Sequence, residues 1–185
     1  MALSKRRPRV MLIADTAWSS RCIEWWGGGG WSHFANVLSD SSIIDARSDA
    51  IKVRGEGRIP PGVQRRPAGY LDDCKRWVLL ELGTEAQYGH WQAALIGQLG
   101  KPYDFIGIRD FLTGSVRDRN WRSESAWFCD ELGIWAQEQA RICPRLPDPI
   151  YRLTPGAALL LDIGLGAQVV ASRGIQDLKR VAAKA

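Results

Sequence analysis

The chain of 185 residues has few histidines and cysteines, and it lacks a long unbroken apolar run. It has two histidines and four cysteines, and no two cysteines stand in a CxxC spacing. This scarcity argues against both a zinc finger and a dense disulfide scaffold. The longest apolar stretch, residues 156–171, is interrupted by Asp162 and by glycines. It therefore predicts a core helix and strand rather than a membrane-spanning helix, and an apolar interfacial surface is the alternative.

A recognisable export signal is also missing. The first residues are basic, as in a signal peptide, but the apolar run "VMLIA" is short and Asp15 follows it. We therefore expect a cytoplasmic protein by default, or one that a phage lysis system or secretion apparatus delivers. In a reducing compartment its thiols stay free.

The chain is rich in apolar and aromatic residues. Hydrophobic residues make up 45% of it and nine are tryptophans, so we expect an ordered core and not a disordered chain. The net charge of +5 comes partly from basic residues near both ends. A basic, Trp-rich chain can be a nucleic-acid or partner-binding module without catalysis. We favour a different explanation of the positive charge, in which the basic residues near the two ends are solvated and the rest of the protein is close to neutral. We therefore expect no obligatory nucleic-acid partner.

The pattern of elements predicts an α+β fold in one domain, residues 1–185, with a core at about 9–160 and a C-terminal extension at 161–185. The expected strands are residues 9–15, 33–38, 42–47, 50–54 and 74–82. The three in the middle are separated by Ser-Asp turns and predict an antiparallel meander, followed by a proline-rich loop at 57–69. Helices are expected at 20–26, 85–99, from Cys129 to about 141, and in the tail 175–185. The second has a capping box, Thr84 with Gln87.

Cys129 stands where the aromatic pair "WF" gives way to a helix. The free N–H groups and positive dipole end of a helix start favour a thiolate and can stabilise an oxyanion. A nearby imidazole would complete the activation. Of the two histidines, His90 lies inside a helix, whereas His33 opens a strand that would hold its ring in a fixed direction.

Asp45 follows His33 by twelve residues, in the next predicted strand. Across a tight turn the two side chains can face each other, so that the carboxylate orients the ring. The hypothesis is a nucleophile at Cys129, a base at His33 and an orienting group at Asp45, with no cofactor. Inert packing of the thiol and a zinc site made by the same three residues are the alternatives.

The ordered segments "WSHFANVLSDSSIIDAR", "KPYDF" and "WFCDELG" resemble the circularly permuted branch of the NlpC/P60 papain-like superfamily, in which the His comes before the Cys. "YRLTPGAALL" is similar to the closing segment of that branch. The resemblance covers residues 9–160. It implies a permuted papain-like fold, a small antiparallel sheet or half-barrel packed against helices.

The resemblance assigns the three roles to the same residues, Cys129, His33 and Asp45. It differs from the family pattern after the cysteine, where members commonly have serine and then glutamate and this chain has Asp130 and Glu131. Two acids suit the helix dipole but oppose a neighbouring thiolate.

The function that we expect is a thiol hydrolase acting on an amide, ester or thioester through an acyl-thioenzyme. Its substrate would be a peptide or another acyl compound, with cell-wall peptides as the first expectation. A lipid-directed acyltransferase or thioesterase of the same fold is the alternative. Trp31 and Trp127 would either wall the substrate groove or belong to the core.

Overall fold

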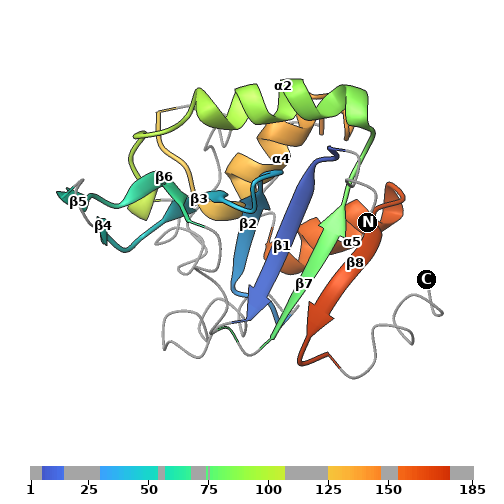
Figure 1. Cartoon of the computed structure of the whole chain (residues 1–185), viewed down its shortest axis with the longest axis horizontal. Coiled ribbons are helices and arrows are strands. Elements are labelled where there is room, and N and C mark those ends of the chain that lie inside the picture. Colours follow the sequence, from blue (N-terminus) through green and yellow to red (C-terminus); the bar gives the residue numbers. More distant parts are fainter. Residues whose placement is uncertain are drawn as a thin grey trace.

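A six-stranded antiparallel sheet organises the molecule (Figure 1). The computed structural model describes residues 6–14, 30–53, 57–67, 74, 76–106, 125–146 and 154–175. In spatial order the sheet runs β6-β3-β2-β1-β7-β8, and every neighbouring pair is antiparallel. Its strands are β1 (Arg9–Ala14), β2 (His33–Val37), β3 (Ile43–Arg47), β6 (Gly62–Arg66), β7 (Arg76–Glu81) and β8 (Gln168–Arg173).

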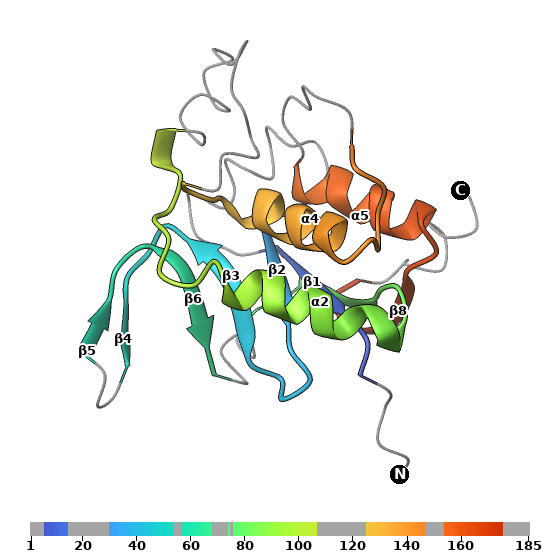
Figure 2. The same ribbon diagram turned by 90° about the horizontal axis from the view of Figure 1, so that it is seen from above.

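In the described part of the chain three helices accompany the sheet: α2 (Glu85–Ile96), α4 (Cys129–Gln139) and α5 (Pro155–Gly164). Figure 2 shows α4 and α5 lying side by side over one face of the sheet. Side chains of β1 alternate, as a strand requires, so Val10 and Leu12 join the core cluster that includes Ile134 of α4 and Ala158 of α5. The fold is therefore α+β, as predicted. None of the helices in the described part of the chain is both long and apolar enough to cross a bilayer.

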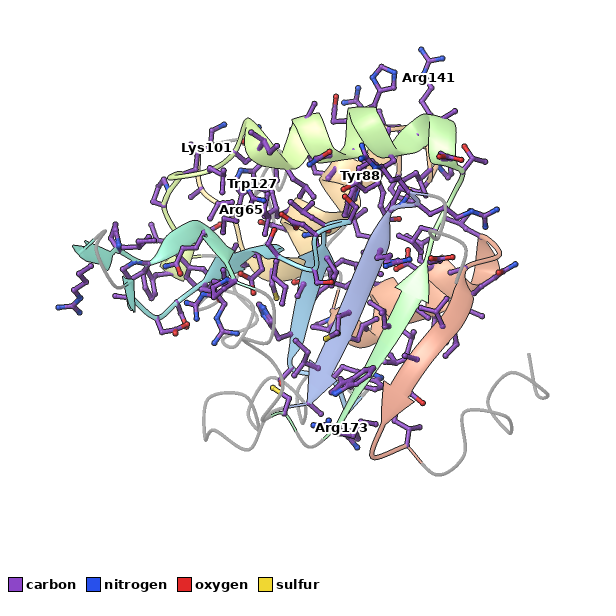
Figure 3. The ribbon with its side chains drawn as sticks, viewed as in Figure 1. Arg65, Tyr88, Lys101, Trp127, Arg141 and Arg173 are labelled. Atoms are coloured by element: carbon purple, nitrogen blue, oxygen red, sulfur yellow. The ribbon has the colours of Figure 1, made fainter. Side chains whose placement is uncertain are left out.

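The helix α2 packs mainly against α4 and lies across one end of the sheet (Figure 1). Its buried residues Tyr88 and Trp91 pack in one cluster with Ile44 of β3 and with Trp127. Figure 3 labels Tyr88 and Trp127 below α2. The predicted cap is present, since the Thr84 backbone N–H donates to Gln87 Oε1 at 2.8 Å. The helix ends at Ile96, three residues before the predicted end, where residues 97–100 form turns.

The predicted meander is right for its first two strands and wrong for the third. β2 pairs with β3, but β4 (Ile51–Val53) pairs with β5 (Gly57–Ile59) in a separate two-stranded sheet. The place beside β3 belongs to β6, within the stretch predicted as a proline-rich loop.

Long-range pairing explains β6. The Val63 N–H donates to the Lys101 carbonyl at 2.8 Å, and Val63 is buried. A Cβ on Gly62 would stand 2.2 Å from that carbonyl oxygen, and Gly62 has φ +147°. Only glycine allows this close approach, so partners distant in sequence, β3 and the Lys101 carbonyl, decide the element and its local composition does not.

Three other expectations concern the ends of the chain and its loops. Residues 168–173, placed in the extension beyond the core, form β8 and complete one edge of the sheet against β7. Residues 156–171 hold most of α5 and the start of β8, so a helix and a strand are present as predicted. The core prediction is right for α5, which buries Ala158 and Leu159, and wrong for β8, an exposed edge strand in which Val169 is 46% exposed. The helix expected at 20–26 lies outside the described residues, as does all but the first residue of the one at 175–185.

Candidate active site

His33 and Asp45 lie together at the start of the β2–β3 hairpin. The Nε2 atom of His33 is 2.6 Å from Oδ2 of Asp45, and the two residues are 8% and 0% exposed. The short connection between two antiparallel strands brings residues twelve apart in sequence into contact. Because Asp45 holds Nε2, the nitrogen left to exchange a proton with another group is Nδ1.

The surroundings keep this imidazole neutral at rest. Burial is the largest effect and lowers the pKa of His33, and the positive charge of Arg47 lowers it further. The hydrogen bond and the charge of Asp45 act in the opposite direction without overcoming them. A neutral ring can accept a proton, which is what a general base must do.

Cys129 is the first residue of α4, as predicted. Its N-cap, Phe128, has extended backbone angles, and its side chain makes no hydrogen bond to the N–H groups of the first turn. The helix approaches β2 very closely, because a Cβ on Gly133 would lie 2.3 Å from the Phe34 ring. Because residue 133 has no side chain, α4 can pack closely against β2, and this packing fixes the position of Cys129 relative to the start of β2.

The electrostatics of Cys129 correct the expectation of a dipole-stabilised thiolate. Burial and then the negative charge of Asp130 raise the pKa of the thiol well above its ordinary value. Hydrogen bonds from the backbone N–H groups of Phe34 and Asp130 lower this pKa, but by less. The resting thiol is therefore protonated at neutral pH, since desolvation outweighs the favourable field of the helix start.

The thiol points toward its neighbour in sequence. Cys129 Sγ donates to Asp130 Oδ1 at 3.4 Å, and burial raises the pKa of Asp130 to about 7. No hydrogen bond joins the Cys129 sulfur to the His33 ring in the described structure. The fold thus joins two of the three predicted residues directly. It brings the third to the backbone of Phe34, the residue after His33.

Two further side chains belong to this neighbourhood, and sequence reasoning did not single them out. Tyr103 is 9% exposed, and the charges of Cys129, Asp130 and Glu131 add to burial in raising the pKa of its hydroxyl. Its backbone bridges to Trp127, two residues before the cysteine. The quoted segment "KPYDF" contained this tyrosine, so the signal was present but no role was assigned to it.

The second is Arg47, which follows Asp45 by two residues on β3 and so shares its face of the strand. Its positive charge lowers the pKa of both His33 and Tyr103. The alternation of the strand was the available signal for this position.

The remaining candidates lie elsewhere. His90 is on the exposed side of α2, and Trp127 is 0% exposed and belongs to the core, not to a groove wall. Trp31 is buried too, with the Arg76 guanidinium 5.3 Å from its ring centroid. Within the described ranges no three His, Cys, Asp or Glu side chains are grouped so that they could hold a metal ion.

Comparison with known proteins gives a distant likeness of fold. No family model matches the chain, and no curated protein matches it. Among solved structures it is similar to the metalloprotein yiiX of Escherichia coli O157:H7 (DUF1105), with a TM-score of 0.51 and 15% sequence identity. The match covers 73% of this chain and 66% of that one, just under two thirds. At this identity the likeness concerns the fold alone.

Proposed function

We propose that the protein is a cysteine-dependent hydrolase or acyltransferase with a permuted papain-like fold of the NlpC/P60 type. The observation that carries the proposal is the 2.6 Å contact between His33 and Asp45, beside a helix that begins at Cys129. A buried carboxylate that orients an imidazole, next to a cysteine at a helix start, is the arrangement that acyl transfer through a thioester needs.

The charge states suggest general-base activation rather than a standing ion pair. Both thiol and imidazole are neutral at rest, so the Nδ1 atom of His33 takes the thiol proton as the sulfur attacks the acyl carbonyl. Asp45 stabilises the imidazolium that forms. For this step the thiol exchanges its contact with Asp130 for one with His33.

The remaining steps of the catalytic cycle use groups of the same site. The tetrahedral oxyanion is stabilised by N–H groups at the start of α4 and by the hydroxyl of Tyr103. It collapses to an acyl-thioenzyme as His33 returns the proton to the leaving amine, alcohol or thiol. Water or another acceptor, deprotonated by His33, then releases the acyl group and regenerates the thiol.

Cell-wall peptides are the substrates that we propose first, because NlpC/P60-type enzymes commonly act on them. Lipid esters or thioesters are the alternative of the same class. The decisive assay measures turnover of peptidoglycan fragments and of lipid esters by the wild type, by Cys129→Ala and by Cys143→Ala. Cys143 is also a buried thiol and serves as the matched control.

We expect Cys129→Ala to lose turnover while it keeps its far-UV circular dichroism, and Cys143→Ala to retain turnover. Retained turnover in folded Cys129→Ala contradicts the nucleophile assignment. The name of yiiX raises a metal site as a rival role for His33, Asp45 and Cys129. Stoichiometric zinc in the purified chain, lost in Cys129→Ala, would favour that role.

A further inference from the structure

The strand that carries His33 begins shortly after a run of four glycines, residues 27–30. Glycine loses more conformational freedom on folding than any other residue, so this run by itself would leave the start of β2 poorly fixed. A general base has to be held in one place, because proton transfer depends on its distance from the group that gives up the proton. The contacts of residues 30–32 therefore decide how firmly His33 is held.

Arg76, the first residue of β7, binds the last residue of this glycine run. Its Nη2 atom donates a hydrogen bond to the carbonyl oxygen of Gly30. Gly30 has φ +67°, and a Cβ at this position would stand 3.3 Å from the same nitrogen. The absence of a side chain at Gly30 thus makes room for the guanidinium, and the guanidinium in turn restricts the glycine.

The same guanidinium lies over the next residue. Its Cζ atom is 5.3 Å from the centroid of the Trp31 ring, which is within the range of a cation–π interaction. Trp31 is 9% exposed and belongs to the buried core cluster that also contains Phe34 and Cys129. Arg76 therefore holds an indole that is part of the same cluster as the proposed nucleophile.

Ser32 completes the attachment of this segment to the sheet. Its N–H and its hydroxyl both donate to the carbonyl oxygen of Ile13 in β1, at 2.9 Å and 3.2 Å. Ile13 is also the residue that pairs with His33 in the register of β1 and β2. Residues 30–32 are thus tied to β7 through Arg76 and to β1 through Ser32, and His33 follows directly.

We propose that Arg76 is a positioning residue for the proposed base. By holding Gly30 and Trp31, it fixes the start of β2. His33 is thereby kept where its ring contacts Asp45. Arg76 acts through the backbone of β2 and not on the reacting atoms. This inference rests on the proposed function and adds to it the residue that keeps the base in place.

The ring proton of His33 reports on this position without any substrate. Its Nε2 lies 2.6 Å from a buried oxygen of Asp45, so the proton between them should give a downfield NMR signal that exchanges slowly with water. The ring of His90, on the exposed side of α2, should give no such signal. We expect exchange about tenfold faster in Arg76→Met, as the loss of one cation–π contact and one hydrogen bond predicts. Arg76→Lys should lie between the two, because an ammonium group cannot both bond to the carbonyl and cover the indole.

Alkylation connects this position with the chemistry. The rate at which iodoacetamide labels Cys129 at pH 7 is measured by mass spectrometry. We expect His33→Gln to slow this labelling, since the base is lost. Arg76→Met should slow it about tenfold, which is less than the full contribution of a general base. Arg76→Lys should recover part of the rate.

The matched control is Arg173→Met. The Arg173 guanidinium also lies over an indole, 5.9 Å from the centroid of the Trp77 ring. It belongs to the edge strand β8, however, and β7 and β1 lie between it and β2 (Figure 3). This variant should lose a similar amount of stability in urea, and it should leave the ring-proton exchange and the labelling of Cys129 at their wild-type rates.

The outcomes separate the two proposals. If folded His33→Gln slows labelling but folded Arg76→Met changes neither labelling nor exchange, the positioning role is overturned and the proposed function stands. If folded His33→Gln labels at the wild-type rate, His33 is not the base and both proposals fall. Equally fast exchange in Arg173→Met overturns the positioning role, because exchange then follows global stability. A wild type without a slowly exchanging ring proton overturns it too. Should Arg76→Met fail to fold, exchange in Arg76→Lys equal to that of the wild type has the same meaning.

Discussion

Asp162 makes the stability of this protein depend on pH in a way that one substitution can remove. It lies in α5, is 1% exposed, and neither of its carboxyl oxygens has a hydrogen-bond partner within the described structure. Gln137 of α4 is near enough to lower the pKa of Asp162 slightly, but burial dominates and raises it from 3.8 to about 7. An unpaired charge at this helix–helix contact is unfavourable.

The direction and size of the effect follow from proton linkage. A carboxyl whose pKa is higher in the folded state binds more protons there, so folding stability falls as pH rises from about 4 to about 7. The difference of about three pH units corresponds to about 4 kcal/mol of stability lost at pH 8. Between pH 5 and pH 8 the loss is about 2–3 kcal/mol by the same arithmetic.

The perturbation is Asp162→Asn, which keeps the shape and cannot ionise. Urea unfolding of wild type and variant at pH 5 and pH 8 gives two differences in the free energy of unfolding. We expect the advantage of the asparagine variant to grow by about 2–3 kcal/mol from pH 5 to pH 8. Groups that titrate in both proteins, such as Asp130 and His33, cancel in this comparison.

Asp40 provides the control, because its side chain is 55% exposed and hydrogen bonds from Ser42 and the charge of Arg65 lower its pKa. Asp40→Asn should therefore give the same difference from wild type at both pH values. An equal difference at pH 5 and pH 8 for Asp162→Asn would refute the reasoning, since the carboxyl would then be hydrated and α5 would not seal it against α4.

Two further predictions concern the placement and the ionisation of the cysteine. Gly133→Ala should destabilise the fold by about 1–3 kcal/mol, because the new methyl group would overlap with the Phe34 ring. The control is Gly89→Ala, at a position of α2 with open space around it, which should stabilise the fold by up to about 1 kcal/mol. Chemical denaturation checks both, and a neutral Gly133→Ala would mean that α4 does not press on β2. Asp130→Asn should make Cys129 react severalfold faster with iodoacetamide at pH 7.5, since it removes the charge that raises the pKa of the thiol. An unchanged or slower rate would contradict the 3.4 Å contact between the two side chains.

The parts of the fold that sequence predicted well depend on neighbours in the chain. The cap at Thr84 and Gln87, the start of a helix at Cys129 and the strand at residues 9–15 need only local patterns of polarity and capping. The meeting of His33 and Asp45 is also nearly local, because a short turn leaves two antiparallel strands few ways to pair. Their contact could therefore be foreseen from a spacing of twelve residues.

Tertiary structure alone decided what distant segments do to one another. The strand β6 exists because β3 pairs with it from Gly62 to Arg66 and the Lys101 carbonyl approaches at Gly62. The position of Cys129 depends on the close contact of Gly133 with Phe34. The protonation states of Cys129, Asp130 and Asp162 could not be predicted from the sequence, because they too depend on packing between distant segments. A helix start favours a thiolate in water, but burial by residues far away in sequence removes the solvation on which that charge depends. Sequence determined which chemical groups the site has, and packing determined how much charge each of them can carry.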